Sequence, residues 1–395
     1  MKIKFIICFI VICSGQYLGY AQKTTDIVIG KKRYIKSVYL NAEREILIYL
    51  PYSYRFNNYT KYPVMYHLDG QKFFHPFTGA VAQLSSDASP HMPEMIVVGI
   101  TSQDRVRDSS PTNSLIGYDG KKNDGFKVSG GADNFLKFIK SELIPFIDKN
   151  YRTNNYRTFA GYSFTGLPVL QALLTMPKTF NSYLVIDFSA WWDNEVMLKN
   201  TLNFFKKYKG KNKDVFIATI ERVNNVVYPE KYNATWRYIQ SFDQNKPATI
   251  GLGFKKYAYK TENHHSMPLR AFIDGIKYIF RGYMINYDEM YTYPQRIAPK
   301  FETLSKRLGY KTCLSEGLLK FFGYQFLNAH PDLEKASFYF NYATQHYPQS
   351  SSAWAGLARV YQAKKDKANA IKYYKKALLL NPKNKAIQKQ LKALK

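Results

Sequence analysis

Short apolar runs alternate with segments of helical periodicity through the middle of the chain, and this alternation constrains the fold more than any other feature. The runs at 63–68 and 95–100 are almost wholly apolar, as strands buried on both faces are. Further strands are predicted at 183–188, 215–220 and 253–259. Because helical segments separate these strands, the sequence predicts an α/β fold with a mainly parallel central sheet flanked by helices.

The segments before and between these strands also have patterns that predict secondary structure. Residues 34–50 alternate in polarity as an edge hairpin does. Residues 134–151 place apolar side chains at helical spacing, with a kink expected at Pro145 because proline lacks the backbone donor. Helices are also expected at 167–174 and 269–280.

The composition supports a large buried core. Of the 395 residues, 46% are hydrophobic and 16% aromatic, which excludes disordered and low-complexity classes. Lys and Arg number 57 against 29 Asp and Glu, a formal charge of +28. Such a charge favours anionic partners or surfaces but says nothing about the fold, and a generally basic proteome would produce the same value.

The first residues have the organisation of a secretory signal peptide. A basic start at Lys2 and Lys4 precedes the apolar run 5–13, which is too short to cross a bilayer. Gly19 and Ala21 place small residues where a signal peptidase reads, so residues 1–21 are predicted to be removed. No later apolar run is long enough to span a membrane. The sequence therefore predicts export, to the periplasm or the medium.

The three cysteines are compatible with export, and they predict no disulfide in the mature chain. Cys8 and Cys13 lie inside the predicted signal peptide, and Ile12 is too large for a lipoprotein acceptor site. The mature chain keeps only Cys313, so it can form no internal disulfide. We interpret Cys313 as a structural thiol.

The tail from residue 317 differs from the rest, and it carries a helical-repeat pattern. Small and aromatic residues stand at the positions that a tetratricopeptide repeat uses for its two packed helices, and a second set recurs 34 residues earlier. The later set is Trp354, Leu357, Ala358, Tyr361, Ala370, Tyr374, Ala377 and Pro382, and the earlier one is Ala336, Phe340, Ala343 and Pro348. Residues 386–394 would form a capping helix. Because so few repeats are present, we expect them to dock on the larger domain and to offer a surface to a protein partner.

Ser163 lies in a pattern typical of a nucleophile elbow. Gly161-Tyr162-Ser163-Phe164-Thr165-Gly166 follows a predicted strand and precedes a predicted helix. A serine hydroxyl is a poor nucleophile at its free pKa, so such a fold exposes it on a sharp turn beside a base. Thr165 occupies the usual position of the second glycine, and Gly166 follows it.

A base and an acid can be placed in the same order along the chain as in hydrolase triads. His264 follows the last predicted strand and precedes the helix at 269–280. Glu221 ends the strand at 215–220, where its carboxylate could hold the imidazole tautomer. Asp193 is the alternative acid. The sequence thus predicts Ser163, His264 and Glu221 as catalytic residues.

Together these residues resemble the putative esterase family of the α/β-hydrolase superfamily, which is similar to enterochelin esterases, S-formylglutathione hydrolases, feruloyl esterases and mycolyltransferases. The resemblance covers roughly residues 30 to 285. The segments that carry it are 63–74, 97–100, 104–108 with 111–112, 130–132, 142–145, 151–153, 191–193 and 262–268.

The resemblance implies an acyl-enzyme mechanism. Ser163 would attack an ester carbonyl, and His264 would take its proton and return it to the leaving group. The backbone N–H groups of Phe164 and of Gly70 or Gln71 would stabilise the oxyanion. His265 stands where the family commonly has a small residue, so it would narrow the mouth of the cleft. No cofactor is implied.

The remaining candidates concern the substrate. Arg105 could bind an anionic substrate, and Trp191 and Trp192 could stack on a sugar or catechol ring, although core packing explains the tryptophans equally well. Ferric-siderophore lactones, acylated carbohydrates and phenolic esters remain open as substrates. No metal-ligand spacing, Walker loop or dinucleotide-binding turn is present, and no nucleic-acid partner is expected.

These observations predict an exported serine esterase with four parts. They are a signal peptide (1–21), an α/β-hydrolase domain (22–285), a helical linker (286–316) and tetratricopeptide-like repeats (317–395). Two alternatives remain open: a non-catalytic binding protein on a hydrolase scaffold, and an acyltransferase that excludes water from the acyl-enzyme.

Overall fold

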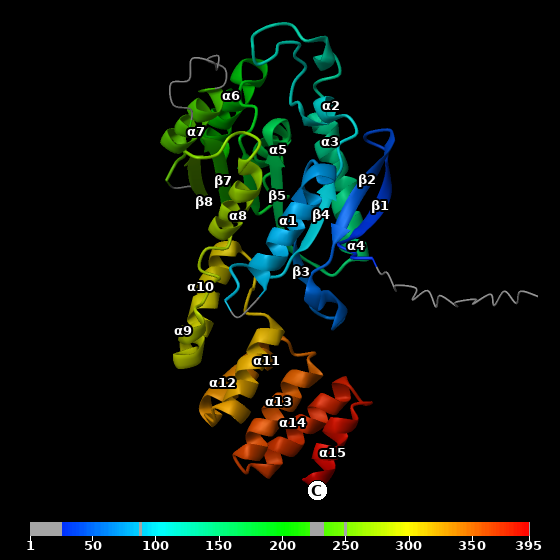
Figure 1. Cartoon of the computed structure of the whole chain (residues 1–395), viewed down its shortest axis with the longest axis vertical. Helices are drawn as coiled ribbons and strands as arrows, with labels where there is room; N and C mark the ends of the chain where they lie inside the picture. Colours follow the sequence, from blue (N-terminus) through cyan, green and yellow to red (C-terminus); the bar gives the residue numbers. More distant parts are fainter. Residues whose placement is uncertain (1–25, 87–88, 222–232, 249–250, 395) are drawn as a thin grey trace, which may run out of the picture.

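The computed structural model describes residues 26–86, 89–221, 233–248 and 251–394. Within them, strands form one eight-stranded sheet in the order β1-β2-β4-β3-β5-β6-β7-β8 (Figure 1). The strands are β1 (Lys31–Ser37), β2 (Ala42–Tyr49), β3 (Tyr62–His67), β4 (Ile96–Ile100), β5 (Thr153–Tyr162), β6 (Ser182–Ile186), β7 (Lys213–Ile220) and β8 (Leu252–Tyr259). The predicted signal peptide, 1–21, lies outside the described residues.

The sheet is parallel from β4 to β8, and β1 and β2 form an antiparallel hairpin at one edge. This confirms the predicted α/β class. The central strands β3, β4 and β6 are buried along their whole length. They are buried because helices cover both faces, which explains why their sequences are continuous apolar runs.

Two sets of helices enclose the sheet. One face is covered by α1 (Gly70–Ser85) and α8 (Met267–Ile279), whose Phe77 and Phe272 rings stack with centroids 3.9 Å apart. On the other face, a second group of helices packs on the sheet and forms a second hydrophobic cluster with it. The helices contributing to it are α3 (Ala132–Phe138), α4 (Ile144–Asn150), α5 (Gly166–Thr175), α6 (Trp192–Lys207) and α7 (Ala234–Asn245).

The predicted long helix at 134–151 is interrupted where proline was expected to disturb it. A π-helical turn at Ile139–Leu143 joins α3 to α4, and Pro145 stands in the first turn of α4. Because Pro145 has no backbone N–H, the regular hydrogen-bond ladder cannot continue through it, and the wider turn absorbs the break.

The tail forms an all-helical unit below the sheet in Figure 1. Its helices are α11 (Glu316–Tyr324), α12 (Leu333–His346), α13 (Ser351–Ala363), α14 (Lys367–Leu380) and α15 (Lys385–Ala393), and the segment before it forms α9 (Tyr287–Thr292) and α10 (Ile297–Leu308). Helices α12 to α15 each begin after a side chain that caps the helix by accepting a backbone N–H. These caps are Asp332, Ser350, Asp366 and Asn384.

Close packing within the repeats depends on glycine. The ring of Phe340 fills the space that a Cβ would need at Gly323 on α11, and also at Gly356 on α13. Hence Phe340, a residue of the repeat pattern, lies where three helices approach one another.

The segment predicted as a helical linker, 286–316, is part of the core. One continuous hydrophobic cluster runs from the α1–α8 face of the sheet through α9 and α10 into α11, α12 and α13. Tyr291 packs against Phe326, and the Tyr339 hydroxyl donates to the carbonyl of Met290 at 2.5 Å. The repeats therefore dock on the larger domain through a packed interface, as their small number required. No helix in the described part of the chain has the length and apolar character needed to cross a bilayer.

Candidate active site

Ser163 lies at the carboxyl end of β5, in a tight turn that leads directly into α5. Its φ of +56° is the strained left-handed conformation of a nucleophile elbow. The flanking glycines are sterically required: a Cβ on Gly161 would lie 2.3 Å from the Thr165 carbonyl oxygen, and one on Gly166 would lie 2.4 Å from the Phe188 Cβ. The turn can form only because both side chains are absent.

His264 meets Ser163 from a loop about one hundred residues further along the chain. Its Nε2 lies 3.2 Å from the Ser163 Oγ. The loop follows β8 and is braced by the Asn263 side-chain oxygen, which accepts from the backbone N–H groups of His265 and Ser266. Tyr162 adds a second brace, because its hydroxyl donates to the His264 carbonyl at 2.6 Å.

Asp187 supplies the carboxylate on the other side of the imidazole. Its Oδ2 lies 2.6 Å from the His264 Nδ1, and its Oδ1 accepts from the Thr219 hydroxyl at 2.6 Å. The side chain is buried, and it follows β6, the strand next to β5. A buried carboxylate at Nδ1 fixes the tautomer in which Nε2 is free to accept a proton from serine.

The structure therefore corrects the predicted acid. Glu221 ends β7 as expected, but its carboxylate is 41% exposed and lies 3.9 Å from the Lys260 ammonium. Asp193 lies in the kinked first turn of α6 and is not the carboxylate that bonds His264. The strand was predicted at 183–188 and so included Asp187, whereas β6 ends at Ile186 and Asp187 lies in the loop that follows. For this reason Asp187 was not considered as the acid. A charged residue inside an otherwise apolar run was the signal that could have revealed it.

The predicted oxyanion-hole residues begin two helical segments beside Ser163. Gly70 and Gln71 open α1, and Phe164 follows the nucleophile at the start of the turn into α5. The first N–H groups of a helix have no acceptor within that helix, so they are available to a ligand. Gly70 must remain glycine, because a Cβ there would lie 2.8 Å from the Gly99 carbonyl carbon of β4.

A cavity of about 310 Å³ opens over the Ser163–His264 pair. Its lining comes from the start of α1, the start of α2 (Arg105–Ser109), the elbow and the His264 loop. The lining residues are Asp69, Gln71, Lys72, Arg105, Tyr162, Ser163, His264 and His265. Gln71, Arg105 and His265 thus line the cavity, whereas Gly70 and Phe164, predicted as backbone donors, are not among its lining residues. Sequence reasoning missed Asp69, Lys72 and Tyr162.

Asp69 joins three segments of the site. It is buried, with a φ of +53°, immediately before α1. Arg105 donates to both of its carboxylate oxygens at 2.9 and 3.0 Å, Ser102 donates to it at 2.9 Å, and the Thr165 hydroxyl lies 3.0 Å from its Oδ2. Arg105 is consequently held by the protein as well as facing the cavity.

Thr165 takes part in the elbow rather than disturbing it. Its hydroxyl accepts from the backbone N–H of Tyr162 at 3.1 Å, and it lies 2.8 Å from the Tyr162 carbonyl as well as beside Asp69. The side chain is buried. A residue that departs from the usual glycine thus connects the elbow to the loop that begins α1.

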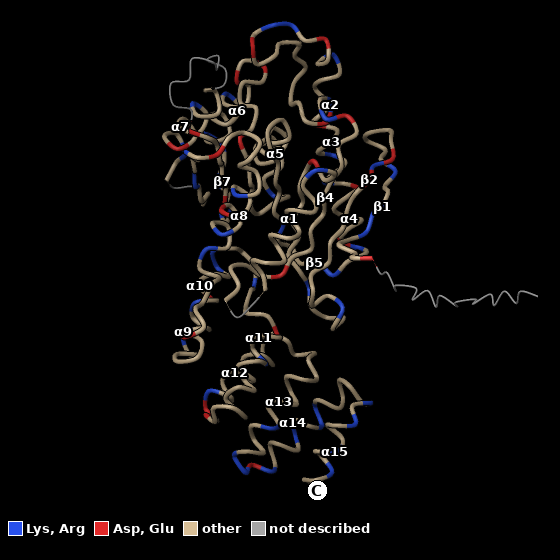
Figure 2. Tube along the Cα trace, viewed as in Figure 1, with Lys and Arg blue, Asp and Glu red and all other residues tan. Residues whose placement is uncertain are grey.

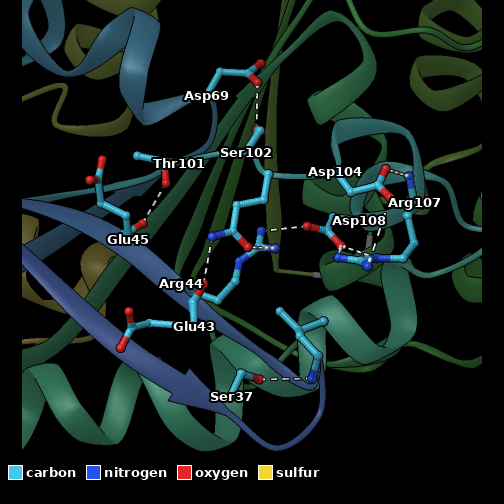
Figure 3. A network of polar contacts seen from close by, with 12 residues as sticks. Ser37, Glu43, Arg44, Glu45, Asp69, Thr101, Ser102, Asp104, Arg107 and Asp108 are labelled. Carbon is cyan, nitrogen blue, oxygen red and sulfur yellow. Dashed lines mark hydrogen bonds and ion pairs between the residues drawn. The ribbon is translucent and has the colours of Figure 1, made fainter.

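Figure 3 shows the polar network behind this loop. Arg44 on β2 donates to the Asp108 carboxylate at 2.5 Å and to the Gln103 side chain at 3.2 Å, and both Arg44 and Asp108 are buried. Arg107 donates to the second oxygen of Asp108 at 2.9 Å. This network fixes the segment 101–110, which carries both Ser102 and Arg105 to Asp69.

The two tryptophans differ in their surroundings. Trp192 is fully buried, with its Nε1 donating to the Thr112 hydroxyl at 3.2 Å and its ring edge-on to Phe164. Its predicted role in substrate binding is therefore wrong, and it packs in the core. Trp191 is half-buried beside Phe126 and Tyr118, outside the cavity lining.

Comparisons with known proteins show the family to which the chain belongs. The family model described as Putative esterase matches residues 37–246, more than half of the chain. The chain belongs to this esterase family. A tetratricopeptide-repeat model matches residues 351–384, which confirms the later of the two predicted repeats.

Relatives of this esterase-family chain include a solved structure described as an IroE-like serine hydrolase from Shewanella oneidensis. It is 30% identical, with a TM-score of 0.72, and the match covers 80% of this chain and 99% of the other. The ferri-bacillibactin esterase BesA of Bacillus subtilis is 32% identical over 40% of this chain and 57% of its own length. The siderophore enterobactin esterase of Emericella nidulans is 40% identical over 20% of this chain and 27% of its own length. The chain therefore spans little more than half of the first curated relative and about a quarter of the second.

Proposed function

We propose that this protein is a serine esterase that cleaves carboxylic esters through an acyl-enzyme on Ser163. The observation that carries the proposal is the continuous hydrogen-bonded chain from the Ser163 Oγ through the His264 imidazole to Asp187, with distances of 3.2 and 2.6 Å. Membership of the esterase family supports it independently.

The first half-reaction transfers the acyl group to serine. As the Ser163 oxygen attacks the ester carbonyl, its proton moves to the His264 Nε2, and Asp187 stabilises the resulting imidazolium. His264 then gives that proton to the alkoxide oxygen as the bond to the alcohol breaks. The alcohol leaves and the acyl group remains on Ser163.

The second half-reaction repeats these steps with water. His264 takes a proton from water, the hydroxide adds to the acyl carbonyl, and the proton returns to Ser163 as the acid is released. In both halves the oxyanion would accept from the N–H of Phe164 and from that of Gln71 or Gly70. Losing one such donor typically costs about 3 kcal/mol of transition-state stabilisation.

For the substrate, we propose an anionic ester of the siderophore class. The relatives named for ferri-bacillibactin and enterobactin support this class. The cavity supports it as well, because the Lys72 ammonium lies in its lining beside the Arg105 guanidinium, which Asp69 already binds. The Lys72 ammonium lies 5.5 Å from the centre of the Tyr162 ring, directly beside the nucleophile turn.

The catalytic proposal is tested by turnover of p-nitrophenyl butyrate and by labelling with a fluorophosphonate probe. Ser163→Ala should abolish labelling and lower kcat by at least about 10⁴-fold. Ser337→Ala, on α12 in the repeats, is the matched control and should behave as the unmodified protein. Equal turnover by the Ser163→Ala protein would remove the catalytic claim. The substrate class is tested with a ferric trilactone siderophore, whose hydrolysis products are separated by chromatography. The unmodified protein should hydrolyse it and the Ser163→Ala protein should not.

Export is proposed on the amino-terminal sequence alone. Residues 1–21 have the basic, apolar and small-residue order of a signal peptide. Expression of the full chain in a bacterial host should yield an extracytoplasmic protein that begins at Gln22. A cytoplasmic protein that retains Met1 would contradict the proposal.

A further inference from the structure

A second cavity lies between the hydrolase sheet and the repeats, away from Ser163. Its volume is about 1320 Å³, larger than the 300–1,000 Å³ typical of small-molecule sites. Thr60 and Glu94 line it just before β3 and β4 begin, so it lies at the amino edge of the parallel strands. Ser163 follows β5 at the carboxyl edge. Residues of α11 and α13 line it on the repeat side. Figure 1 shows these two helices below the base of the sheet.

Aromatic rings project from both walls of this junction cavity. Tyr52 and Phe56, from the turn after β2, are 68% and 62% exposed, and Phe321 of α11 is 44% exposed on the repeat side. The Arg55 guanidinium lies over the Tyr52 and Phe56 rings at 4.4 and 5.0 Å and steadies them. Aromatic side chains that gather at a concave surface are a common feature of ligand pockets.

Neutral hydrogen-bonding side chains stand among the aromatic ones in the lining, although most of the lining surface is apolar. They include the amides of Asn58, Gln83, Gln349 and Asn381 and the hydroxyl of Ser351. Hydroxyl and amide groups both donate and accept hydrogen bonds. Such a lining suits a ligand that itself carries many hydroxyl groups.

The charged side chains of the lining are occupied by protein partners. Glu94 accepts from the backbone and hydroxyl of Ser53. Glu316 accepts from the hydroxyl of Tyr59 at 2.6 Å and pairs with Lys320 at 2.8 Å. In a chain with a formal charge of +28, the described lining therefore presents no surplus of cations. An anionic ligand would find its complement elsewhere on this protein.

We propose that the junction cavity is a binding site for a neutral oligosaccharide, separate from the ester-cleaving site. Sugar rings offer apolar faces to Tyr52, Phe56 and Phe321 and hydroxyl groups to the surrounding amides. An extended peptide is less well matched, because its backbone presents one donor and one acceptor per residue, whereas each sugar ring carries several hydroxyl groups. The site would hold the enzyme on a glycan while esters are cleaved at the opposite edge of the sheet.

Calorimetric titration of the full chain with cellohexaose, xylohexaose and maltohexaose tests the proposal. At least one of the three should bind with a Kd below about 1 mM, and neither Phe56→Ala nor Phe321→Ala should change kcat/KM for p-nitrophenyl butyrate. Both variants should weaken sugar binding at least tenfold. Tyr39→Ala removes an aromatic ring of comparable exposure outside the lining and should bind normally.

Other outcomes overturn the proposal. They are failure of all three hexasaccharides to bind, unchanged binding by the Phe56→Ala protein, or competitive inhibition of ester cleavage by the sugar. Binding of a proline-rich decapeptide in place of any hexasaccharide would assign the cavity to a peptide instead. Because the exposed rings contribute little to the core, circular dichroism should show that each variant is folded.

Discussion

The carboxylate of Asp187 lies 2.6 Å from the Nδ1 of His264, although 77 residues separate them in the chain. Asp187 follows β6 and His264 follows β8, so the two strands end at the same edge of the sheet. Between them the Thr219 hydroxyl of β7 donates to the other Asp187 oxygen. Three successive strands thus define the geometry of the base.

Replacing Asp187 should therefore damage the base more than any change at Glu221. Asp187→Asn keeps the shape but can donate to Nδ1, which favours the wrong tautomer, and kcat should fall by about 10³–10⁴-fold. Glu221→Gln should alter kcat less than twofold, because its carboxylate faces Lys260. Steady-state kinetics with p-nitrophenyl butyrate distinguish the two. A large loss at Glu221 and none at Asp187 would refute this assignment.

The Thr165 hydroxyl should matter for both stability and rate. Thr165→Val keeps the volume but leaves the Tyr162 N–H without its acceptor and Asp69 without one donor. An unsatisfied buried group costs about 1–3 kcal/mol, so the free energy of unfolding should fall by that amount. We also expect kcat/KM to fall about tenfold, whereas Thr165→Ser should restore both values. Urea unfolding and kinetics measure them, and a Val variant as active and stable as the Ser variant would contradict the expectation.

Acid should destabilise the fold through His67. Burial beneath α1 lowers the pKa of His67 to about 4, whereas the unfolded chain titrates near 6.5. Between these values the unfolded state binds the extra proton, so stability is complete above about pH 6.5 and falls as the pH drops toward 4. The loss should approach about 3 kcal/mol.

His346 contributes to the same pH dependence, because burial and the charge of Lys311 lower its pKa to about 4 as well. Its contribution must therefore be measured separately. His67→Gln should show a flatter pH dependence of unfolding free energy over this range, and His346→Gln isolates the second contribution. An unchanged slope in the His67→Gln protein would remove the buried imidazole as the cause.

Cys313 should be unreactive in the folded protein. Burial raises its pKa to about 11, and its sulfur lies 3.5 Å from the Tyr347 hydroxyl. The thiolate that alkylating reagents attack is therefore scarce at pH 8. Iodoacetamide should modify Cys313 at least about a hundredfold more slowly in buffer than in urea, as followed by mass spectrometry of its peptide. Equal rates would show that the thiol is accessible.

Periodicity and local sequence were sufficient for most of the fold. The runs at 63–68 and 95–100 could only be buried strands, because no amphipathic face exists in them for solvent. Repeat spacing located α12 to α14, since Phe340 and the small residues around it must interlock. Gly161 and Gly166 indicated the elbow, because the turn leaves no room for a side chain at either position. The protein partner expected for the repeats stays a prediction.

Tertiary structure alone decided which groups meet. Several strands end in polar residues, and the sequence cannot rank Glu221 against Asp187, because only strand order and the reach of each loop determine which carboxylate faces His264. The same holds for Thr165 and Asp69, 96 residues apart, and for the junction cavity, whose walls come from the two ends of the chain. Local sequence fixes what each segment becomes, whereas a site depends on distances between segments, and these are set by how the whole core packs.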